Sequence, residues 1–333
     1  MYDFKNCVIM NRQTSILTLL VTFVSACGAY YFFKKRNSKR PPKKWRKLGY
    51  VKSLYIYPLK SGSYLDIQKV ECGKFGFSLP AIENMYQLRD RSFMVYSEAH
   101  MEGKWIGIYN KMVLIALSSK DQNHVLLEAP EKYALCVEVP TQNNSNVKTI
   151  RFQSWSKDDV PIIDCGDEAS KWLSQFLLQK DSGLRLGFHD KPFYNGLKMR
   201  KGLYENFGPV MLMNYKTMTD LNAKLEEKVT DAYFRPNIVL DGPDLEPFEE
   251  DNCVWLKIGN VVARNFFDCV RCIAITVNPK TGLRDKTREP LKELSKYRMS
   301  NGPRKGPKMG VYLEVINPGT ISVLDEVYVG IED

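Results

Sequence analysis

The residues best suited to chemistry in this chain are two cysteines that enclose an arginine. Residues 266–277 read FFDCVRCIAITV, which places Cys269 and Cys272 on either side of Arg271. The apolar and β-branched run after the pair predicts a strand that begins at Cys272. A thiol beside a cation is more easily deprotonated, and the thiolate is the form that binds a metal or attacks a substrate. The pair therefore indicates a metal ligand or a nucleophile.

Three other interpretations compete with a functional thiolate. A zinc half-site needs two more ligands, but the other cysteines are scattered and the three histidines (His100, His124 and His189) are not suitably spaced. A thioredoxin-type pair opens a helix, whereas this pair is expected to open a strand. Two ordinary buried cysteines, the commonest fate of this residue type, remain an open alternative.

Short polar motifs on both sides of the cysteine pair favour the functional interpretation. They are YPLKS at 57–61, LRDR at 88–91, YFRPNIVL at 233–240, NPKTG at 278–282, REPL at 288–291 and NPGT at 317–320. Their order and spacing resemble the MOSC domain and its N-terminal associated domain over nearly everything after Lys47. Within that superfamily, the layout looks most like the mitochondrial amidoxime-reducing components, which are membrane-anchored molybdenum enzymes.

Charge separates the N-terminal residues from the body of the chain. The net charge is +10, and residues 34–47 hold nine Lys or Arg and no acid. With the first 14 residues set aside as well, the remaining body is neutral. A neutral body argues against a nucleic-acid-binding domain.

An uncharged run precedes the basic strip and predicts a membrane anchor. Residues 15–33 are nineteen residues without a charge, about the length that crosses a bilayer core, and they end in interfacial aromatics. The positive charge follows the run, whereas a cleaved secretory signal carries it in front. We expect a tail at 1–14, a transmembrane signal anchor at 15–33 and a basic, proline-containing tether at 34–47. The body then faces the cytosol, and the resemblance implies the mitochondrial outer membrane.

The body reads as many short strands with few helices, which predicts a β-rich α+β fold. We expect a MOSC N-terminal β-barrel-like domain at 48–183 and a MOSC β-barrel domain at 184–333. Helical spacing of apolar residues predicts helices at 166–180 and 217–229, and a short one near Glu289-Pro290. Strands are expected, among others, at 105–109, 112–117 and 234–240. The eight cysteines form no disulfide framework, which suits a reducing compartment.

The resemblance implies a molybdenum cofactor, Mo-molybdopterin, and assigns residues to it. Cys272 is implied to be the molybdenum ligand and the catalytic residue, while Cys269 has no such role. The implied cofactor-binding residues are Lys60, Ser61, Arg91, Arg235, Asn237, Arg271 and Tyr312. The residue types agree, because cations at turns and strand ends suit a phosphate-bearing ligand held in a pocket.

Two positions depart from the family pattern. The family commonly has a Thr-Ser pair where this chain has Phe207-Gly208 before Pro209, so both hydroxyls are missing. The residue between the first cysteine and the arginine is usually serine but is Val270 here. Both changes affect peripheral contacts and leave the expected ligand and arginines in place.

By the same resemblance, the expected activity is the two-electron reduction of N-hydroxylated compounds such as amidoximes, hydroxylamines and N-oxides. The chain has no flavin or haem signature, so NADH-cytochrome b5 reductase and cytochrome b5 are the implied electron donors. The alternative is a MOSC module without turnover, which either binds and carries the molybdenum cofactor or transfers sulfur to it. Residues 284–308 hold nine basic residues against three acids, which is either a docking face for an acidic haem carrier or an ordinary solvated face.

Overall fold

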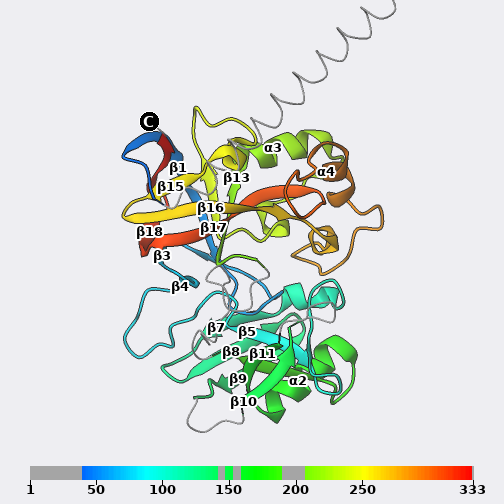
Figure 1. Ribbon diagram of the computed structural model, residues 1–333. Helices are drawn as coiled ribbons and strands as arrows, with labels where there is room; N and C mark the ends of the chain where they lie inside the picture. The colour runs from blue at the N-terminus through cyan, green and yellow to red at the C-terminus, as the bar shows by residue number, and fades with distance from the viewer. Residues whose placement is uncertain (1–39, 142–146, 153–158, 190–206, 332–333) are drawn as a thin grey trace, which may run out of the picture. The chain divides into compact units, whose positions relative to one another are not determined.

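The largest sheet of the protein joins the two ends of the described chain. The computed structural model describes residues 40–141, 147–152, 159–189 and 207–331 (Figure 1). Strand β1 (Lys44–Ile56) pairs antiparallel with β19 (Glu326–Ile331) and also with β14 (Ile238–Asp241). The order is β14-β13-β17-β16-β15-β19-β1-β2, so the β1–β14 pairing joins the two sides of the sheet. The other strands are β2 (Leu65–Ile67), β13 (Val210–Asn214), β15 (Trp255–Ile258), β16 (Val261–Val270) and β17 (Lys308–Asn317).

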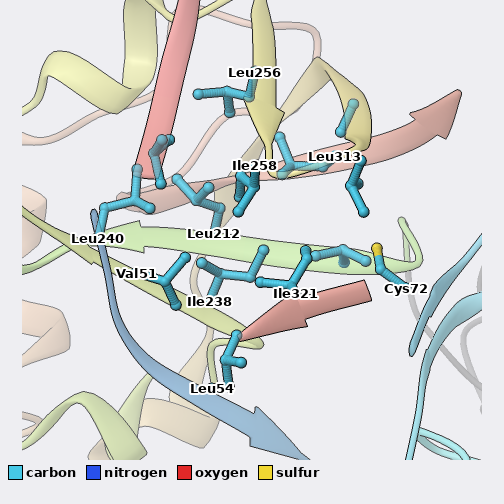
Figure 2. Packing of buried hydrophobic residues seen from close by; sticks show 14 of the residues in the cluster. Val51, Leu54, Cys72, Leu212, Ile238, Leu240, Leu256, Ile258, Leu313 and Ile321 are labelled. Carbon is cyan, nitrogen blue, oxygen red and sulfur yellow. The ribbon is translucent and has the colours of Figure 1, made fainter. Parts of the chain in front are cut away.

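Alternation along these strands builds the core of this sheet. In β17 the side chains of Val311, Leu313 and Val315 are buried, because every second residue points to the same face. Figure 2 shows Leu313 and Leu212 pointing into one apolar cluster with residues from neighbouring strands. The three short strands β18 (Gly319–Ser322), β3 (Lys69–Gly73) and β4 (Gly76–Ser78) form a separate small sheet.

A second, smaller barrel is closed by β10-β11-β12-β5-β6. Helix α2 (Asp167–Leu178) contacts β12 and β9 (Figure 1). Its Trp172 side chain is completely buried. The helix expected at 166–180 is therefore confirmed. The barrel strands are β5 (Phe93–Ser97), β6 (Glu102–Gly103), β10 (Val147–Arg151), β11 (Asp159–Asp164) and β12 (Leu184–Phe188). The strands β7 (Ala116–Ser119), β8 (His124–Ala129) and β9 (Lys132–Glu138) form a further sheet.

The sequence places a domain boundary between residues 183 and 184, and two strands pair with strands on the other side of it. β12 follows that point but pairs with β5 and β11 in the smaller barrel. β1 precedes it but pairs with β14 and β19 in the large sheet. The sheets are thus completed by strands exchanged across the expected boundary.

The remaining helices of the described residues are short, and the fold is β-rich as expected. They are α3 (Tyr215–Lys224), α4 (Leu291–Tyr297) and the 3-10 helices η1 (Asn110–Leu114), η3 (Asp231–Tyr233), η4 (Glu249–Asn252) and η5 (Ile273–Thr276). The strand expected at 105–109 is a turn, and the strand expected at 112–117 begins in η1 and is a strand only at Ala116 and Leu117 in β7. Both errors have one cause: a short apolar run does not distinguish a strand from a buried turn.

The expected N-terminal segments lie largely outside the described residues. This applies to the tail at 1–14, the anchor at 15–33 and the tether as far as residue 39. Of the tether expected at 34–47, residues 44–47 belong to β1. Among the residues that the structure describes, no helix is long and apolar enough to span a membrane.

Candidate functional site

One pocket collects seven of the eight residues that the sequence marks as a site. Its empty volume is about 750 Å³, including the open mouth. The marked residues that line it are Lys60, Ser61, Arg91, Arg235, Arg271, Cys272 and Tyr312. They come from turns and strands that are far apart in the sequence, so the fold brings together what the motifs only implied.

The two cysteines occupy different environments at the end of β16. Cys269 lies within the strand and is 1 % exposed, whereas Cys272 follows the strand end and is exposed. The expectation that Cys272 begins a strand is wrong, because it is the N-cap of η5. The pair therefore ends a strand and precedes a 3-10 helix of four residues, not the α-helix that a thioredoxin-type pair opens. This position presents one thiol to the pocket mouth and buries the other.

Two tight turns carry site residues: Lys60 and Ser61 lie in the turn between β1 and β2, and Arg91 lies in the turn before β5. The Lys60 N–H donates to the Phe93 carbonyl at 2.8 Å, and the Arg91 N–H donates to the Tyr57 carbonyl at 2.7 Å. Lys60 is 6 % exposed and Arg91 is 8 % exposed. A buried cation requires an anion or strong hydrogen-bond acceptors nearby, so these turns hold charge in place at a cost in desolvation.

Arg235 lies in the turn between η3 and β14, whereas the sequence predicts a strand at 234–240. Its Nη1 donates to the Gly62 carbonyl at 2.6 Å, so the arginine contacts the turn that holds Ser61. Asn237 is fully buried and does not line the pocket. Its Oδ1 accepts from the Met211 N–H at 3.0 Å, and its Nδ2 donates to the Tyr55 carbonyl at 3.2 Å. Asn237 thus joins β13 to β1 beneath the site.

Three of these site residues have left-handed backbone conformations. The φ angles are 66° for Ser61, 51° for Arg91 and 53° for Arg235. Such a conformation costs a residue with a Cβ roughly 1 kcal/mol, and it persists only where the surroundings enforce it. Strained backbone concentrates at functional sites, and three such residues around one pocket point to a binding site.

The ring of Tyr57 lies against two of the arginines. The guanidinium carbons of Arg91 and Arg235 are 4.8 and 4.2 Å from the ring centroid. Complete burial raises the pKa of the Tyr57 phenol, so the ring remains neutral. Arg91 also forms an ion pair with Asp90, which lies behind the pocket lining. The motif at 57–61 marked this tyrosine, but only the structure shows that it supports the two cations.

Apolar residues complete the pocket, and the sequence did not indicate them. Trp105 and Ile106 form one wall, and Phe234, Met211 and Ile275 are further lining residues. Arg284 anchors the segment that follows Ile106 by donating to the Gly107 carbonyl at 2.8 Å. Nothing in the pattern around 105–109 separates a pocket wall from the strand expected there.

The lining residues suit an anionic ligand that carries a soft metal. The described ones contribute four cations (Lys60, Arg91, Arg235 and Arg271) and no carboxylate. The exposed Cys272 thiol offers the kind of soft ligand that a thiophilic metal prefers. Cations for a phosphate, hydroxyls for a pterin edge and one thiolate for the metal are the donors that Mo-molybdopterin requires. The residues present therefore fit that cofactor.

One departure from the family pattern, Phe207-Gly208, is built into the packing. A Cβ added at Gly208 would lie 2.9 Å from the Cβ of Tyr312 and 3.0 Å from the Phe266 ring. Phe207 stacks on Phe267 with ring centroids 5.8 Å apart. The glycine therefore permits an aromatic cluster at the position where the family pattern places a hydroxyl.

The basic segment at 284–308 is only partly a charged surface. Arg298 is 7 % exposed and pairs with Asp251 at 2.7 Å, and Lys308 pairs with the same carboxylate at 2.9 Å. These two cations are neutralised inside the fold, so they do not belong to an exposed positive face. The exposed basic residues of the segment are Lys286, Arg288, Lys292, Lys296 and Lys305.

Comparison with known proteins places this site in a family. The MOSC N-terminal beta barrel domain matches residues 48–180, and the MOSC domain matches residues 200–328. Mitochondrial amidoxime-reducing component 1 of Danio rerio is 32% identical over 332 residues, covering 96% of this chain and 95% of the relative. Mitochondrial amidoxime reducing component 2 of Bos taurus is 32% identical over 305 residues, covering 87% and 86%. Its Homo sapiens counterpart is 30% identical over 310 residues, covering 88% and 87%. The chain therefore belongs to the family of the mitochondrial amidoxime-reducing components and combines a MOSC N-terminal β-barrel domain with a MOSC domain.

Proposed function

We propose that this chain is a molybdenum-cofactor oxidoreductase that reduces N-hydroxylated compounds such as amidoximes, hydroxylamines and N-oxides. The observation that carries the proposal is the convergence of cations from both domains around one exposed thiol. The names of the relatives give amidoxime reduction as the family activity. Membership of the MOSC family supports a molybdenum cofactor.

Each group in the pocket has a task in this proposal. When bound, the cofactor would supply a redox metal centre that passes two electrons to the N–O bond, with two protons releasing the oxygen as water, and is reduced again by two electrons from a donor. Cys272 holds the metal through its thiolate, a role that its position after β16 permits. Lys60, Arg91 and Arg235 neutralise the phosphate, and their preformed positions limit the reorganisation needed on binding. Trp105 and Ile106 exclude water from that side of the pocket.

We further propose that the electrons come from NADH through NADH-cytochrome b5 reductase and cytochrome b5, as the family resemblance implies. Tethering all the components to one membrane would raise their effective concentration. We place the protein in the mitochondrial outer membrane, anchored by residues 15–33, with the body in the cytosol. Protease added to intact mitochondria should then remove the body, and full protection of the body would contradict this topology.

The proposal is tested on the purified chain in two steps. Metal and pterin analysis should find molybdenum and the pterin at near-equal amounts in the unmodified protein, and neither in substantial amount in Cys272→Ala. Benzamidoxime turnover with a small-molecule reductant should follow the metal content. The matched control is Cys136→Ala, which changes a partly buried cysteine in β9. A protein that carries metal and pterin but shows no turnover would be a carrier, and the oxidoreductase proposal would then be wrong.

A further inference from the structure

The guanidinium of Arg271 is engaged by the protein's own backbone. Its Nε and Nη2 both donate to the Met309 carbonyl, with the Nε contact at 2.9 Å. Its Nη1 donates to the Phe234 carbonyl at 2.7 Å, and Nη2 also lies 3.6 Å from the Met211 sulfur. Most of the N–H groups of this side chain are therefore directed at neutral acceptors within the fold. This differs from the use expected of a cation that binds an anion.

The acceptors of Arg271 belong to the two segments that must be held in register at the site. Phe234 directly precedes Arg235, and Met309 lies near the start of β17, which pairs with β16. On the far side of the same turn, Arg91 donates to the Arg235 carbonyl at 3.4 Å. Two successive carbonyls of one turn are thus held by two arginines from different parts of the chain.

The backbone of Arg271 is fixed as well. Its N–H donates to the Pro307 carbonyl at 2.7 Å, one residue beyond the last paired residue of β16. Cys272 is the next residue, so the thiol is attached to a point that is held by its main chain and by its side chain. A movement of the Arg235 turn relative to Cys272 would break the hydrogen bonds of the Arg271 side chain.

We propose that Arg271 is a positioning residue that clamps the turn bearing Cys272 to the turn bearing Arg235, and that it does not itself bind the anion. The identity of that anion rests on the proposed function, but the clamp is a property of this chain alone. Lysine cannot replace it, because a single ammonium cannot donate in two opposite directions from one rigid plane. Loss of the forked N–H groups of the guanidinium, here called the fork, also leaves the Met309 and Phe234 carbonyls without this donor, which destabilises the turn.

Two variants of Arg271 distinguish a clamp from a direct anion contact. Arg271→Lys keeps the charge and loses the fork, whereas Arg271→Gln loses the charge. The matched control is Arg264→Lys, which changes another buried arginine of β16, one that pairs with Glu314 at 2.7 Å. Arg235→Gln serves as the reference for a direct loss at the anion site. All proteins are full-length and free of cofactor, so that the outcome does not depend on turnover.

Two quantities are measured on these proteins. Calorimetry gives the dissociation constant of inorganic phosphate, and mass spectrometry gives the rate of iodoacetamide alkylation at Cys272 relative to Cys136. We expect both Arg271 variants to change that alkylation ratio at least threefold, and Arg264→Lys to leave it unchanged. We expect phosphate affinity to fall less than threefold in Arg271→Gln but at least tenfold in Arg235→Gln.

Opposite results would overturn the clamp. If Arg271→Gln loses phosphate affinity to the same extent as Arg235→Gln, then Arg271 binds the anion directly. If Arg271→Lys keeps the alkylation ratio of the unmodified protein, then the fork does not position the thiol. If the unmodified protein fails to bind phosphate, the proposed anion site is wrong, while the alkylation ratio still decides the clamp.

Discussion

Arg91 donates to the backbone carbonyl of Arg235 at 3.4 Å, across 144 positions of the sequence. The two guanidinium groups also share the ring of Tyr57. Two like charges held this close repel each other, and the repulsion is strongest where water is excluded. Their left-handed backbones add strain to this arrangement. Asp90 compensates part of this charge through its ion pair with Arg91, and an anion bound in the pocket would add to that compensation.

Exchange of Cys269 separates the two roles within the cysteine pair. Cys269 is buried in an apolar cluster at the pocket lining, so Cys269→Ala should cost about 1 kcal/mol of stability and keep most of the amidoxime turnover. Cys272→Ala should abolish turnover without a comparable loss of stability, because its side chain is exposed. Urea denaturation and turnover measured on both variants check this. Equal loss of turnover in both would return the pair to a shared structural role.

Relief of backbone strain should stabilise the protein at the expense of its site. Ser61→Gly removes the Cβ at a φ of 66°, so we expect a gain of about 1 kcal/mol in the free energy of unfolding. Molybdenum content should fall, because the hydroxyl is lost. Glu131→Gly is the control, since Glu131 has a φ of 58° in the exposed turn between β8 and β9. It should gain similar stability and keep its molybdenum. A loss of stability in Ser61→Gly alone would assign the hydroxyl a structural role.

The sequence predicted those parts of the site that a short motif contains, and it missed those that depend on contacts between distant residues. The motifs marked Lys60 and Arg91 by residue type, and the pocket contains both. The strand expected from Cys272 is η5, since an apolar run of five residues packs as well in a 3-10 turn as in a strand. Asn237 was marked by its motif, yet its amide joins β1 to β13 instead of lining the pocket. That role depends on which strands become neighbours, and no short motif contains this information.

The sheets show the same limit on a larger scale. Alternating apolar residues predicted most strands, including β8 and β9, because the period of two is local. The exchange of β1 and β12 between the halves was not predicted, because strand pairing is set by contacts between distant residues. The sequence alone also treats the basic segment at 284–308 as one charged surface, because it does not show which distant acids pair with its cations. The partner that neutralises Arg298 is Asp251, which lies 47 positions upstream.

Restoring the family hydroxyl should not restore its contact in this chain. In Gly208→Ser the new Cβ would meet Tyr312 and Phe266 at about 3 Å, so we expect a loss of 1–3 kcal/mol, roughly the cost of overpacking. Gly73→Ser is the control, because its nearest neighbour would be the Gly76 carbonyl oxygen at 3.6 Å. Urea midpoints compare the two variants. An unchanged midpoint in Gly208→Ser, together with higher molybdenum content, would show that the cluster yields to the hydroxyl.

A buried carboxyl away from the pocket should make stability depend on pH. Glu250 is fully buried and accepts from the Thr217 hydroxyl at 2.9 Å. Burial, with a smaller effect of Asp251 and an opposing one of Arg298, raises its pKa from 4.5 to about 7. The folded state therefore binds a proton that the unfolded state releases between these values. Stability is full below pH 4.5 and declines as pH rises towards 7, by on the order of 3 kcal/mol.

Glu250→Gln isolates this effect, because the amide keeps the size of the protonated acid and does not titrate. The urea midpoint of the unmodified protein should be lower at pH 8 than at pH 5. The midpoint of the variant should change less between these two pH values. At pH 8 the variant should be the more stable of the two. Parallel midpoints across the range would show that the Glu250 carboxylate is accommodated without cost.

We predict that the exposed basic residues at 286–296 form the docking face for the acidic haem carrier that we propose as electron donor. Charge complementarity mainly speeds the encounter of two proteins. Changing Lys286, Arg288, Lys292 and Lys296 together to Gln should therefore raise the KM for the haem donor at low salt. Turnover with a small-molecule reductant should be unchanged, because none of the four lines the pocket. Arg298 is left in place, since its buried pair with Asp251 supports the fold.

A second quadruple variant tests whether position or only total charge matters. Lys69, Lys74, Lys171 and Lys180 are also exposed, and their change to Gln removes charge of the same size from other elements. This control should keep the KM of the unmodified protein. Salt should raise that KM towards the value of the first variant, because exposed charges about 10 Å apart are largely screened near 0.1 M. If both quadruple variants behave alike, net charge governs the encounter and the 286–296 segment is not the docking face.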